Sequence, residues 1–492
     1  MSFHDHQSQL PASLSYPKAL AISLAAVGML ILSHAGLLAQ GIPATITVNS
    51  KASTSAVTGD ADDPAIWVHP INPAKSVIIG TDKEGNGGLH VWDMDGKQIQ
   101  YVPLGNPNNV DVRYGMLVGG QLIDIAVTNL RSNPKQIKVF KINSTDGTLT
   151  DVTTNGGILT PQLADPYGIC LYKRPSDGAM FVIESTQSGA NKNNLHQYLL
   201  QDDGAGKVKG NYVRAIGNGV IKAYVEGLVV DDELGYVYAS DEPNAIRKFY
   251  ADPARGDNNQ IVAFAINDGI SGDREGLGIY KCPGGTGYLV ASSQGNSTVK
   301  IYRREGEAGD PHKHTLLTTI KTNGSTETDG LDITNLPTSA NFPKGFLIKH
   351  NAPGKQFILY AWEDIAQTYL SICPESEPSA IAGESASALP EVFTLQQNYP
   401  NPFLRGAPSS LAGSPSTTIS FHLEKAASIK LTVINLMGQT VRTLAAGQMA
   451  AGDHATVWDG RNEAGEIVPS GTYLIQLQNG NRTQIKKLMM VK

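Results

Sequence analysis

Six times between Asp62 and Asp329, a polar and mostly acidic residue stands beside a small residue and is followed by an apolar run. The steps lie at Asp63, Asn109, Tyr167, Glu226, Glu275 and Asp329, so their spacings are 46, 58, 59, 49 and 54 residues. A repeat of this period indicates an architecture of repeated units, and the lengths suit the blades of a β-propeller. We therefore expect a six-bladed propeller over residues 45–370, with each apolar run as the first strand of a blade.

Each unit also contains a second predicted strand with a polar far end, at residues 76–83, 124–131, 180–185, 236–242, 288–294 and 346–351. In an antiparallel pair, the start of the first strand lies beside the end of the second. If the first strands line a central channel, as in propellers, the polar ends meet at one mouth of that channel. The side chains expected there are Asp63, Glu226, Glu275 and Asp329 from first strands, and Lys83, Arg131, Glu242 and Gln294 from second strands.

The pattern changes after residue 370. Residues 374–390 are rich in Pro, Glu, Ser and Ala without periodicity, which predicts a linker over 371–392. Alternating runs at 418–423, 429–434 and 471–477 then predict half-buried strands. We expect a small immunoglobulin-like β-sandwich over residues 393–492, so the predicted fold class is all-β throughout.

The N-terminal segment has the outline of a secretory signal peptide. Lys18 precedes an apolar stretch over 19–32, and Leu37-Leu38-Ala39-Gln40 resembles a cleavage site. A retained membrane anchor is the alternative, because the stretch to Leu38 is nearly long enough to span a bilayer. We expect a cleaved signal over residues 1–40 and a protein that is secreted or carried on the cell surface.

Composition supports this organisation. The chain has 492 residues, 41% of them hydrophobic, with 51 glycines and 27 prolines, which suits a turn-rich β protein. A net charge of -6 argues against a nucleic-acid partner. The three cysteines, Cys170, Cys282 and Cys373, allow at most one disulfide. Cys170 and Cys282 lie in or beside apolar strand patterns and are expected to be buried thiols.

The acidic residues at the predicted mouth suit calcium, which prefers several carboxylate, amide and backbone oxygens in flexible geometry. No His or Cys cluster accompanies them in the sequence, which makes zinc and copper poor candidates. Taken singly, each acidic step could simply turn the chain into a strand. The predicted metal-binding set is Asp62, Asp63, Glu226, Glu242, Asp273, Glu275, Gln294 and Asp329.

Cationic residues accompany this acidic set. Lys83 and Arg131 end second strands, and Lys192 lies in a nearby polar loop over 187–192. Arginine recognises phosphate with planar, paired hydrogen bonds, and lysine acts as a mobile point charge. Calcium ions with Arg and Lys around a channel indicate a site for a highly phosphorylated anion, at which a metal-bound hydroxide could attack phosphorus.

Residues 50–366 resemble the β-propeller phytases, which are calcium-dependent phosphatases of inositol hexakisphosphate (phytate) with a six-bladed fold. The segments that carry the resemblance are 62–68, 108–114, 231–235, 291–297 and 327–332. The resemblance implies a 3-phytase-type phosphoric monoester hydrolase, a monomer that binds several calcium ions (Ca2+), catalytic and structural, and acts on phytate or calcium-phytate. It also implies attack by a calcium-bound water without a Ser, Cys or His nucleophile.

The resemblance assigns roles to the matched positions. Catalytic calcium ligands would be Asp62, Glu226, Glu242, Asp273, Glu275 and Asp329, while Asp63 and Gln294 would help to hold structural ions. Lys83, Arg131 and Tyr167 would bind the phosphate being cleaved and, with Glu226, form the catalytic set; Lys192 would add to substrate binding. The chain departs from the family pattern at Glu84, Asn323 and Asn351, which predicts weaker occupancy of a peripheral calcium site.

The last hundred or so residues resemble the C-terminal sorting domain of bacterial proteins exported by the type IX pathway. The segments that carry this resemblance are 398–403, 436–439, 458–460 and 469–473. A generic immunoglobulin-like carbohydrate-binding or spacer module is the alternative, because a fold alone does not establish a function. The resemblance implies that the export machinery is a partner of this domain.

Two alternatives to phytate hydrolysis stay open. A calcium phosphatase could act on a different phosphomonoester, and ligand count and charge do not separate it from a phytase. The propeller could instead be a non-catalytic surface module that calcium only stiffens. The presence of Lys83, Arg131 and Tyr167 favours an enzyme, because structural calcium sites need none of them.

Overall fold

The computed structural model describes residues 41–373, except 71, 85, 218, 256–259 and 325, and residues 393–491, except 399–400, 402, 405–415, 436–438 and 480–481. The predicted signal peptide and nearly all of the predicted linker lie outside the described residues. Among the residues described, no helix combines the length and apolar character needed to cross a membrane.

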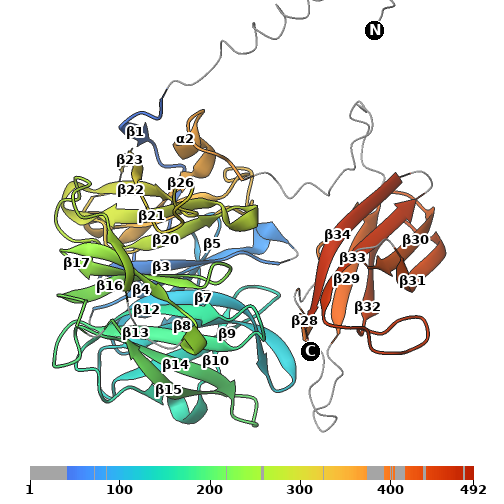
Figure 1. Ribbon diagram of the computed structural model, residues 1–492, viewed down its shortest axis with the longest axis horizontal. Helices are drawn as coiled ribbons and strands as arrows, with labels where there is room; N and C mark the ends of the chain where they lie inside the picture. The colour runs from blue at the N-terminus through green and yellow to red at the C-terminus, as the bar shows by residue number, and fades with distance from the viewer. Residues whose placement is uncertain are drawn as a thin grey trace, which may run out of the picture. The chain divides into compact units, whose positions relative to one another are not determined.

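Six sheets follow one another along the first part of the chain (Figure 1). Blade 1 consists of β3 (Ala61–Trp67), β4 (Val77–Asp82), β5 (Gly88–Asp93) and β6 (Gln98–Pro103). Blade 2 consists of β7 (Pro107–Val118), β8 (Gln121–Leu130), β9 (Gln136–Ile142), β10 (Leu149–Asp151) and β11 (Ile158–Leu159). Blade 3 consists of β12 (Pro166–Lys173), β13 (Met180–Thr186), β14 (Leu195–Asp202) and β15 (Val208–Ile216). Blade 4 consists of β16 (Tyr224–Asp231), β17 (Tyr236–Glu242), β18 (Ala245–Tyr250) and β19 (Gln260–Phe264). Blade 5 consists of β20 (Leu277–Lys281), β21 (Gly287–Ser293), β22 (Thr298–Arg303) and β23 (Leu316–Thr322). Blade 6 consists of β24 (Leu331–Thr334), β25 (Phe346–Asn351) and β26 (Gln356–Ala361). Short 3-10 turns are η1 (Pro73–Lys75), η2 (Thr154–Gly156), η3 (Pro253–Arg255), η4 (Pro283–Gly285), η5 (Gln294–Asn296) and η6 (Ala352–Gly354). The predicted six-bladed, all-β propeller is confirmed.

Two strands from the start of the described chain close the ring. β2 (Ala52–Ser53) pairs antiparallel with β26 and becomes the outer strand of blade 6. β1 (Thr45–Val48) pairs in parallel with β23 in blade 5, so segments far apart in sequence lie side by side (Figure 1). Trp92 of blade 1 also packs edge-on against Phe357 of blade 6, with ring centroids 5.7 Å apart.

The first strands surround a small central cavity of about 40 Å3. Its lining includes Ala65, Asp111, Ile169, Val229, Gly276 and Leu331, which come from all six blades. This arrangement confirms the prediction that the first strands line a central channel. Most of the apolar core lies between neighbouring blades, as in the buried cluster that joins blades 3 and 4.

The recurring polar step in the sequence coincides with a β-bulge in blades 1 to 4. In four blades the pairing of the first two strands shifts register at this step, between Ala61 and Pro64, Pro107 and Val110, Pro166 and Ile169, and Val225 and Leu228. A bulge adds a residue to one strand and redirects a side chain. In these four blades the polar side chain of the step is therefore turned out of the regular alternation of its strand.

Glycine is needed in several of these steps because the next blade lies directly against it. A Cβ atom at Gly168 would lie 2.1 Å from the backbone oxygen of Glu226. A Cβ atom at Gly227 would lie 2.3 Å from the backbone oxygen of Glu275. The small residue of one step thus makes room for the polar step of the following blade.

We expect Gly227→Ala to destabilise the protein by about 1–3 kcal/mol, the usual cost of forcing extra atoms into a packed site. The displaced neighbour is backbone, so a rotamer change cannot relieve the overlap. Thermal or denaturant unfolding measures the effect. Gly41→Ala is the matched control, because a Cβ atom at Gly41 meets nothing within 4 Å. Equal stability of the two variants would contradict this explanation of the glycine.

The segment after blade 6 is fastened to blade 5. Trp362 begins the short helix α2 (Trp362–Ala366) and stacks on Tyr280 at a centroid distance of 4.0 Å. A disulfide joins Cys282 to Cys373, which are 91 residues apart. The expectation of a buried thiol is confirmed for Cys170 and wrong for Cys282. Local strand patterns could not show that the chain returns to blade 5 after α2.

We expect replacement of Cys282 and Cys373 by serine to lower the free energy of unfolding by about 2–4 kcal/mol, because the crosslink restricts the unfolded chain. Denaturant unfolding of the double variant measures this loss. Cys170→Ser is not a suitable control, since the buried hydroxyl would add its own cost. Wild-type protein unfolded with and without a reductant provides the comparison, and coincident curves would contradict the prediction.

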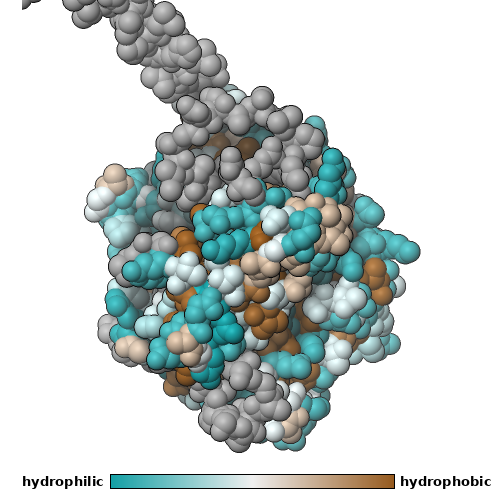
Figure 2. All heavy atoms as spheres, turned by 90° about the vertical axis from the view of Figure 1, so that its right-hand side faces the viewer, coloured by the Kyte–Doolittle hydropathy of each residue, from teal (hydrophilic) through white to brown (hydrophobic). Residues whose placement is uncertain are grey.

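The C-terminal part forms two further sheets. One contains β27 (Phe393–Leu395), β29 (Thr417–Leu423) and β32 (Gly452–Trp458); the other contains β28 (Phe403–Leu404), β34 (Arg482–Val491), β33 (Gly471–Asn479), β30 (Ala427–Ile434) and β31 (Thr440–Met449). Their shared core includes the fully buried Trp458, Ile419, Leu431 and Ile475. The three strands predicted from alternation are all present. On the face in Figure 2, hydrophobic side chains lie in small groups among hydrophilic ones.

Candidate functional site

In every blade, a side chain from the second strand contacts a backbone N–H group at the polar step of the first strand. The backbone N–H groups of Asp63, Asn109, Gly168, Glu226 and Gly276 donate to Thr81, Asn129, Ser185, Glu242 and Ser292, respectively. In blade 6, Nδ1 of His350 lies 3.2 Å from the backbone nitrogen of Asp329. These contacts hold the start of each first strand beside the end of the second, as the sequence predicted.

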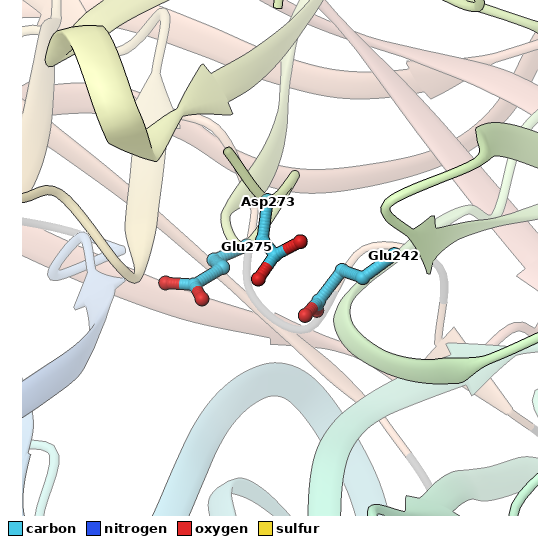
Figure 3. A group of neighbouring side chains, drawn as sticks. All are labelled: Glu242, Asp273 and Glu275. Carbon is cyan, nitrogen blue, oxygen red and sulfur yellow. The ribbon is translucent and has the colours of Figure 1, made fainter. Parts of the chain in front are cut away.

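Glu242, Asp273 and Glu275 point their carboxylates toward one another (Figure 3). Each offers an oxygen that lies within 4.8 Å of the others. Glu242 Oε1 accepts the N–H of Glu226 at 3.1 Å, whereas Glu242 Oε2 is buried without a hydrogen-bond partner among the described residues. Such an arrangement fits a hard divalent cation, which takes oxygen ligands from several carboxylates.

Four carboxyl groups of the site, those of Asp62, Glu226, Glu242 and Glu275, resist ionisation in the metal-free protein. Burial, followed by repulsion from neighbouring carboxylates, raises the pKa of Glu226 to about 8 and of Glu242 to about 10. Burial, a hydrogen bond with Asp329 and repulsion from neighbouring carboxylates raise the pKa of Glu275 to about 12. Burial also raises the pKa of Asp62 to about 6, against the opposing effect of Lys83. A bound cation would reverse these shifts, because its charge favours the ionised forms.

Lys83 lies among the carboxylates of the site. Its Nζ is 2.6 Å from Asp62 Oδ1 and 3.6 Å from carboxylate oxygens of both Asp60 and Asp329. Burial opposes its charge, but the surrounding carboxylates, Asp62 and Glu226 foremost, raise the pKa of Lys83 above its ordinary value. Lys83 therefore carries a positive charge next to the oxygens that could hold a metal.

Gln294 and His350 hold Asp329 in place. The Gln294 Nε2 group donates to Glu275 Oε2 at 2.8 Å and to Asp329 Oδ1 at 2.9 Å. His350 Nδ1 is 3.3 Å from Asp329 Oδ2. Burial acts to raise the pKa of Asp329, but contacts with His350, Glu275 and Lys83 together hold it below its ordinary value. Asp329 thus stays ionised without a metal.

Glu226 connects the carboxylates of the site to Arg131. Asn108 Nδ2 donates to Glu226 Oε1 at 2.8 Å, and Asn108 Oδ1 accepts from Arg131 at 3.1 Å. Tyr167 also hydrogen-bonds the Glu226 carboxylate, and the Arg131 guanidinium lies 5.8 Å from the centroid of its ring. Burial and the Glu226 charge raise the pKa of Tyr167, so it keeps its proton and can donate.

Arg131 is held by partners that sequence reasoning did not identify. Its Nε and one terminal nitrogen donate to the two oxygens of Asp165 at 2.9 and 2.7 Å, and the same terminal nitrogen contacts Gln187 at 3.0 Å. Asn108 and His350 were also missed as members of the site. Asn108 lies within a segment that carried the family resemblance, but neither its pairing with Glu226 nor that of Asp165 with Arg131 has a signal in local spacing.

Two predicted site residues have other surroundings. One Asp63 oxygen accepts the N–H of Val110 at 3.0 Å, so Asp63 links blade 1 to blade 2. Lys192 is exposed and forms no ion pair within the part of the chain that the structure describes. Asn323 donates to Asn49 at 2.8 Å, and Asn351 accepts from the N–H of Thr326 at 3.2 Å. The roles assigned to Asp63 and Lys192, and the weaker peripheral calcium site, stay predictions.

The chain was compared with protein families and with individual known proteins. The phytase family model matches residues 18–372, and the FlgD Ig-like domain model matches residues 407–482. The 3-phytase of Bacillus subtilis is 34% identical over 368 residues, which cover 72% of this chain and 94% of the relative.

Two partial likenesses accompany this match. The basal-body rod modification protein FlgD of Salmonella typhimurium is 35% identical over 72 residues, which cover 14% of this chain and 31% of that protein. The WD40 β-propeller domain of Doa1 aligns with a TM-score of 0.36 and 10% identity, over 66% of this chain and 99% of that domain. The match over residues 18–372, together with the 34% identity along nearly the whole of a 3-phytase, shows that the chain belongs to the phytase family of phosphoric monoester hydrolases.

Proposed function

We propose that this chain is a calcium-dependent phytase that releases phosphate from phytate or calcium-phytate. The observation that carries the proposal is the position of Glu226. Its backbone N–H donates to Glu242, which forms an acidic triad with Asp273 and Glu275. Its carboxylate accepts from Asn108, the residue that also contacts Arg131. A metal-binding group and a phosphate-binding arginine thus share one central residue.

Calcium is the metal that the donor set favours. The ligands on offer are carboxylate oxygens of Asp62, Glu226, Glu242, Asp273, Glu275 and Asp329. Oxygen donors suit calcium or magnesium, and a crowded protein-only set suits calcium, because magnesium usually keeps several waters. Asp62 Oδ2 and Glu242 Oε2 are both buried without a hydrogen-bond partner among the described residues, as expected of oxygens that await a cation.

Bound calcium, Arg131, Lys83 and Tyr167 would each interact with the phosphate in a different way. Bound calcium would supply positive charge beside the phosphate oxygens and lower the pKa of a water. Arg131 can donate its remaining N–H group to the phosphate and supply positive charge there, because Asp165, Gln187 and Asn108 accept its other four N–H groups and fix the plane of its guanidinium. Lys83 adds a point charge, and the protonated Tyr167 donates a hydrogen bond. All three groups stabilise negative charge that grows on the phosphate oxygens during the reaction.

The test is phosphate release by the purified full chain from calcium-phytate, with and without EDTA, beside a simple phosphomonoester. We expect release that falls at least ~100-fold with EDTA, since metal-ion catalysis contributes several kcal/mol. Excess calcium should restore it. No release in the presence of calcium would favour a non-catalytic binding propeller. Equal release from p-nitrophenyl phosphate would favour a calcium phosphatase with another substrate.

We also propose that the protein is exported, as a monomer, to the medium or the cell surface, and that residues 393–492 address it to the type IX machinery. The support is the resemblance of the C-terminal segments to sorting domains and the signal-like N-terminus. Mass spectrometry of both termini of the exported protein tests the proposal. Retention of residues 1–40, or export that is unchanged when residues 393–492 are deleted, would contradict it.

A further inference from the structure

Blade 3 carries a pocket that the phosphate chemistry does not use. Its volume is about 550 Å3 and its lining is Leu159, Gln162, Asn191, Asn194, His196, Tyr198, Gly210, Tyr212 and Ala215. None of these residues belongs to the acidic group around Glu226. We refer to this cavity as the blade 3 pocket.

Polar atoms in the blade 3 pocket lack partners. His196 is 4% exposed, and neither ring nitrogen has a hydrogen-bond partner among the described residues. The same holds for Oδ1 of Asn194, which also lines the pocket. Buried polar groups are nearly always hydrogen-bonded, because leaving one unpaired costs about 1–3 kcal/mol. These atoms are therefore suited to a polar ligand that enters the pocket.

The walls of the blade 3 pocket are already ordered. The Gln162 amide donates to the Tyr198 hydroxyl, and Asn191 Nδ2 donates to the backbone oxygen of Gln162 at 2.9 Å. The Tyr212 ring lies 5.6 Å from the Tyr198 ring and 5.9 Å from the His196 ring. Tyr212 nevertheless stays 54% exposed, so an aromatic surface faces the solvent at this site.

The charges around the blade 3 pocket disfavour an anion. No Lys, Arg, Asp or Glu occurs among the described residues that line it. Glu184, the cross-strand neighbour of His196, is fully buried, and burial raises the pKa of its carboxyl group to about 8, so it offers no positive charge to an anion. Burial lowers the pKa of His196 to about 4, so the ring is neutral near pH 7. Three cations, Lys192, Lys209 and Arg214, each adjoin a lining residue in sequence, but none of them lines the pocket. Arg214 instead donates to Gln197 and to the backbone oxygen of Tyr250.

We propose that the blade 3 pocket binds a neutral sugar ring. A sugar presents apolar C–H faces that can pack on the exposed Tyr212 ring. Its hydroxyl groups both donate and accept, which matches the His196 nitrogens and the amides of Gln162, Asn191 and Asn194. Placed polar groups beside an aromatic side chain are a common feature of small-molecule sites. This binding would hold the enzyme on a glycan and is separate from phosphate release.

Saturation-transfer NMR on the full calcium-loaded chain tests the proposal. The probes are glucose, galactose, mannose, N-acetylglucosamine and myo-inositol, with inositol hexasulfate as an anionic competitor. We expect saturable transfer to the ring protons of at least one neutral probe, with a dissociation constant on the order of millimolar. Tyr212→Ala should weaken this binding at least ~10-fold, equivalent to about 1.4 kcal/mol, and leave phytate hydrolysis unchanged.

Tyr101→Ala is the matched control. Tyr101 is 41% exposed and lies against His90 in blade 1, as Tyr212 lies against His196 in blade 3. Its replacement should leave sugar binding unaltered. Absence of saturable transfer from all the neutral probes would overturn the proposal. So would transfer that Tyr212→Ala leaves intact, or displacement of the sugar by inositol hexasulfate that Lys192→Ala abolishes, since the pocket would then be an anion subsite.

Discussion

Replacing Glu226 with glutamine is expected to lower kcat/KM for phytate by about 100- to 1,000-fold, the usual cost of removing one electrostatic group from an active site. Glu226 is 3% exposed and lies between the acidic triad and the Asn108–Arg131 pair. Glutamine keeps the side-chain shape and removes the negative charge. The substitution should therefore weaken the hold on calcium and on the reacting phosphate together.

The fold of the Glu226→Gln variant should survive. Burial and the charges of Asp62 and Asp329 already raise the pKa of Glu226 to about 8, so an uncharged side chain suits this position in the metal-free protein. Steady-state phosphate release and thermal unfolding, measured on the same sample, separate the two effects. Glu424→Gln, an exposed change of the same kind in the C-terminal domain, is the control. Loss of the folded state would make Glu226 structural, and unchanged kcat/KM would exclude it from the catalytic set.

The metal-free protein is expected to lose stability as the pH rises from 5 to 8, and calcium is expected to restore it. Glu226, Glu242 and Glu275 have pKa values of about 8, 10 and 12 in the folded chain. Their ordinary value is 4.5, so above that pH the unfolded chain gives up these protons while the folded chain keeps them. The unfolded state then binds fewer protons, and the free energy of unfolding falls with rising pH. Asp329 has a lowered pKa and a contribution of opposite sign, which is lost only below about pH 4.

Calcium should raise Tm at pH 8 by roughly 5 °C, because stabilisation of a few kcal/mol shifts Tm by about 1.5 °C per kcal/mol in a propeller of about 330 residues. The shift at pH 5 should be smaller, since protons compete for the same oxygens. Thermal unfolding at both pH values, with calcium or with EDTA, provides the measurement. Sodium chloride at matched ionic strength is the control. A metal-free Tm that does not change between pH 5 and 8 would contradict the pKa shifts.

Much of the fold was predictable because it repeats. The polar step, the following apolar strand and the polar end of the second strand recur with a regular period, and antiparallel pairing then places the two polar ends together. The same reasoning located Glu226, Glu242 and Glu275 at one mouth. It could not show that the steps are bulges, since a bulge is a mismatch between two paired strands rather than a property of either strand.

The glycines at the steps illustrate the same limit. The sequence around Gly168 and Gly227 predicts only that they are turn residues, but each makes room for the backbone of the next blade. The contact joins segments about one repeat apart, and only ring packing reveals it. The closing strands β1 and β2 and the Cys282–Cys373 link are more distant still, so nothing in the local pattern could indicate them.

The sequence by itself determined the number of blades, the two all-β regions and the residue types that suit calcium and phosphate, because strand periodicity and carboxylate chemistry are local. Only the tertiary structure decided which of these groups share a partner. It placed Glu226 against Glu242 and Asn108, paired Arg131 with Asp165, and turned Asp63 toward blade 2. Those contacts depend on the angle between neighbouring blades, which arises when all the blades pack together around one axis.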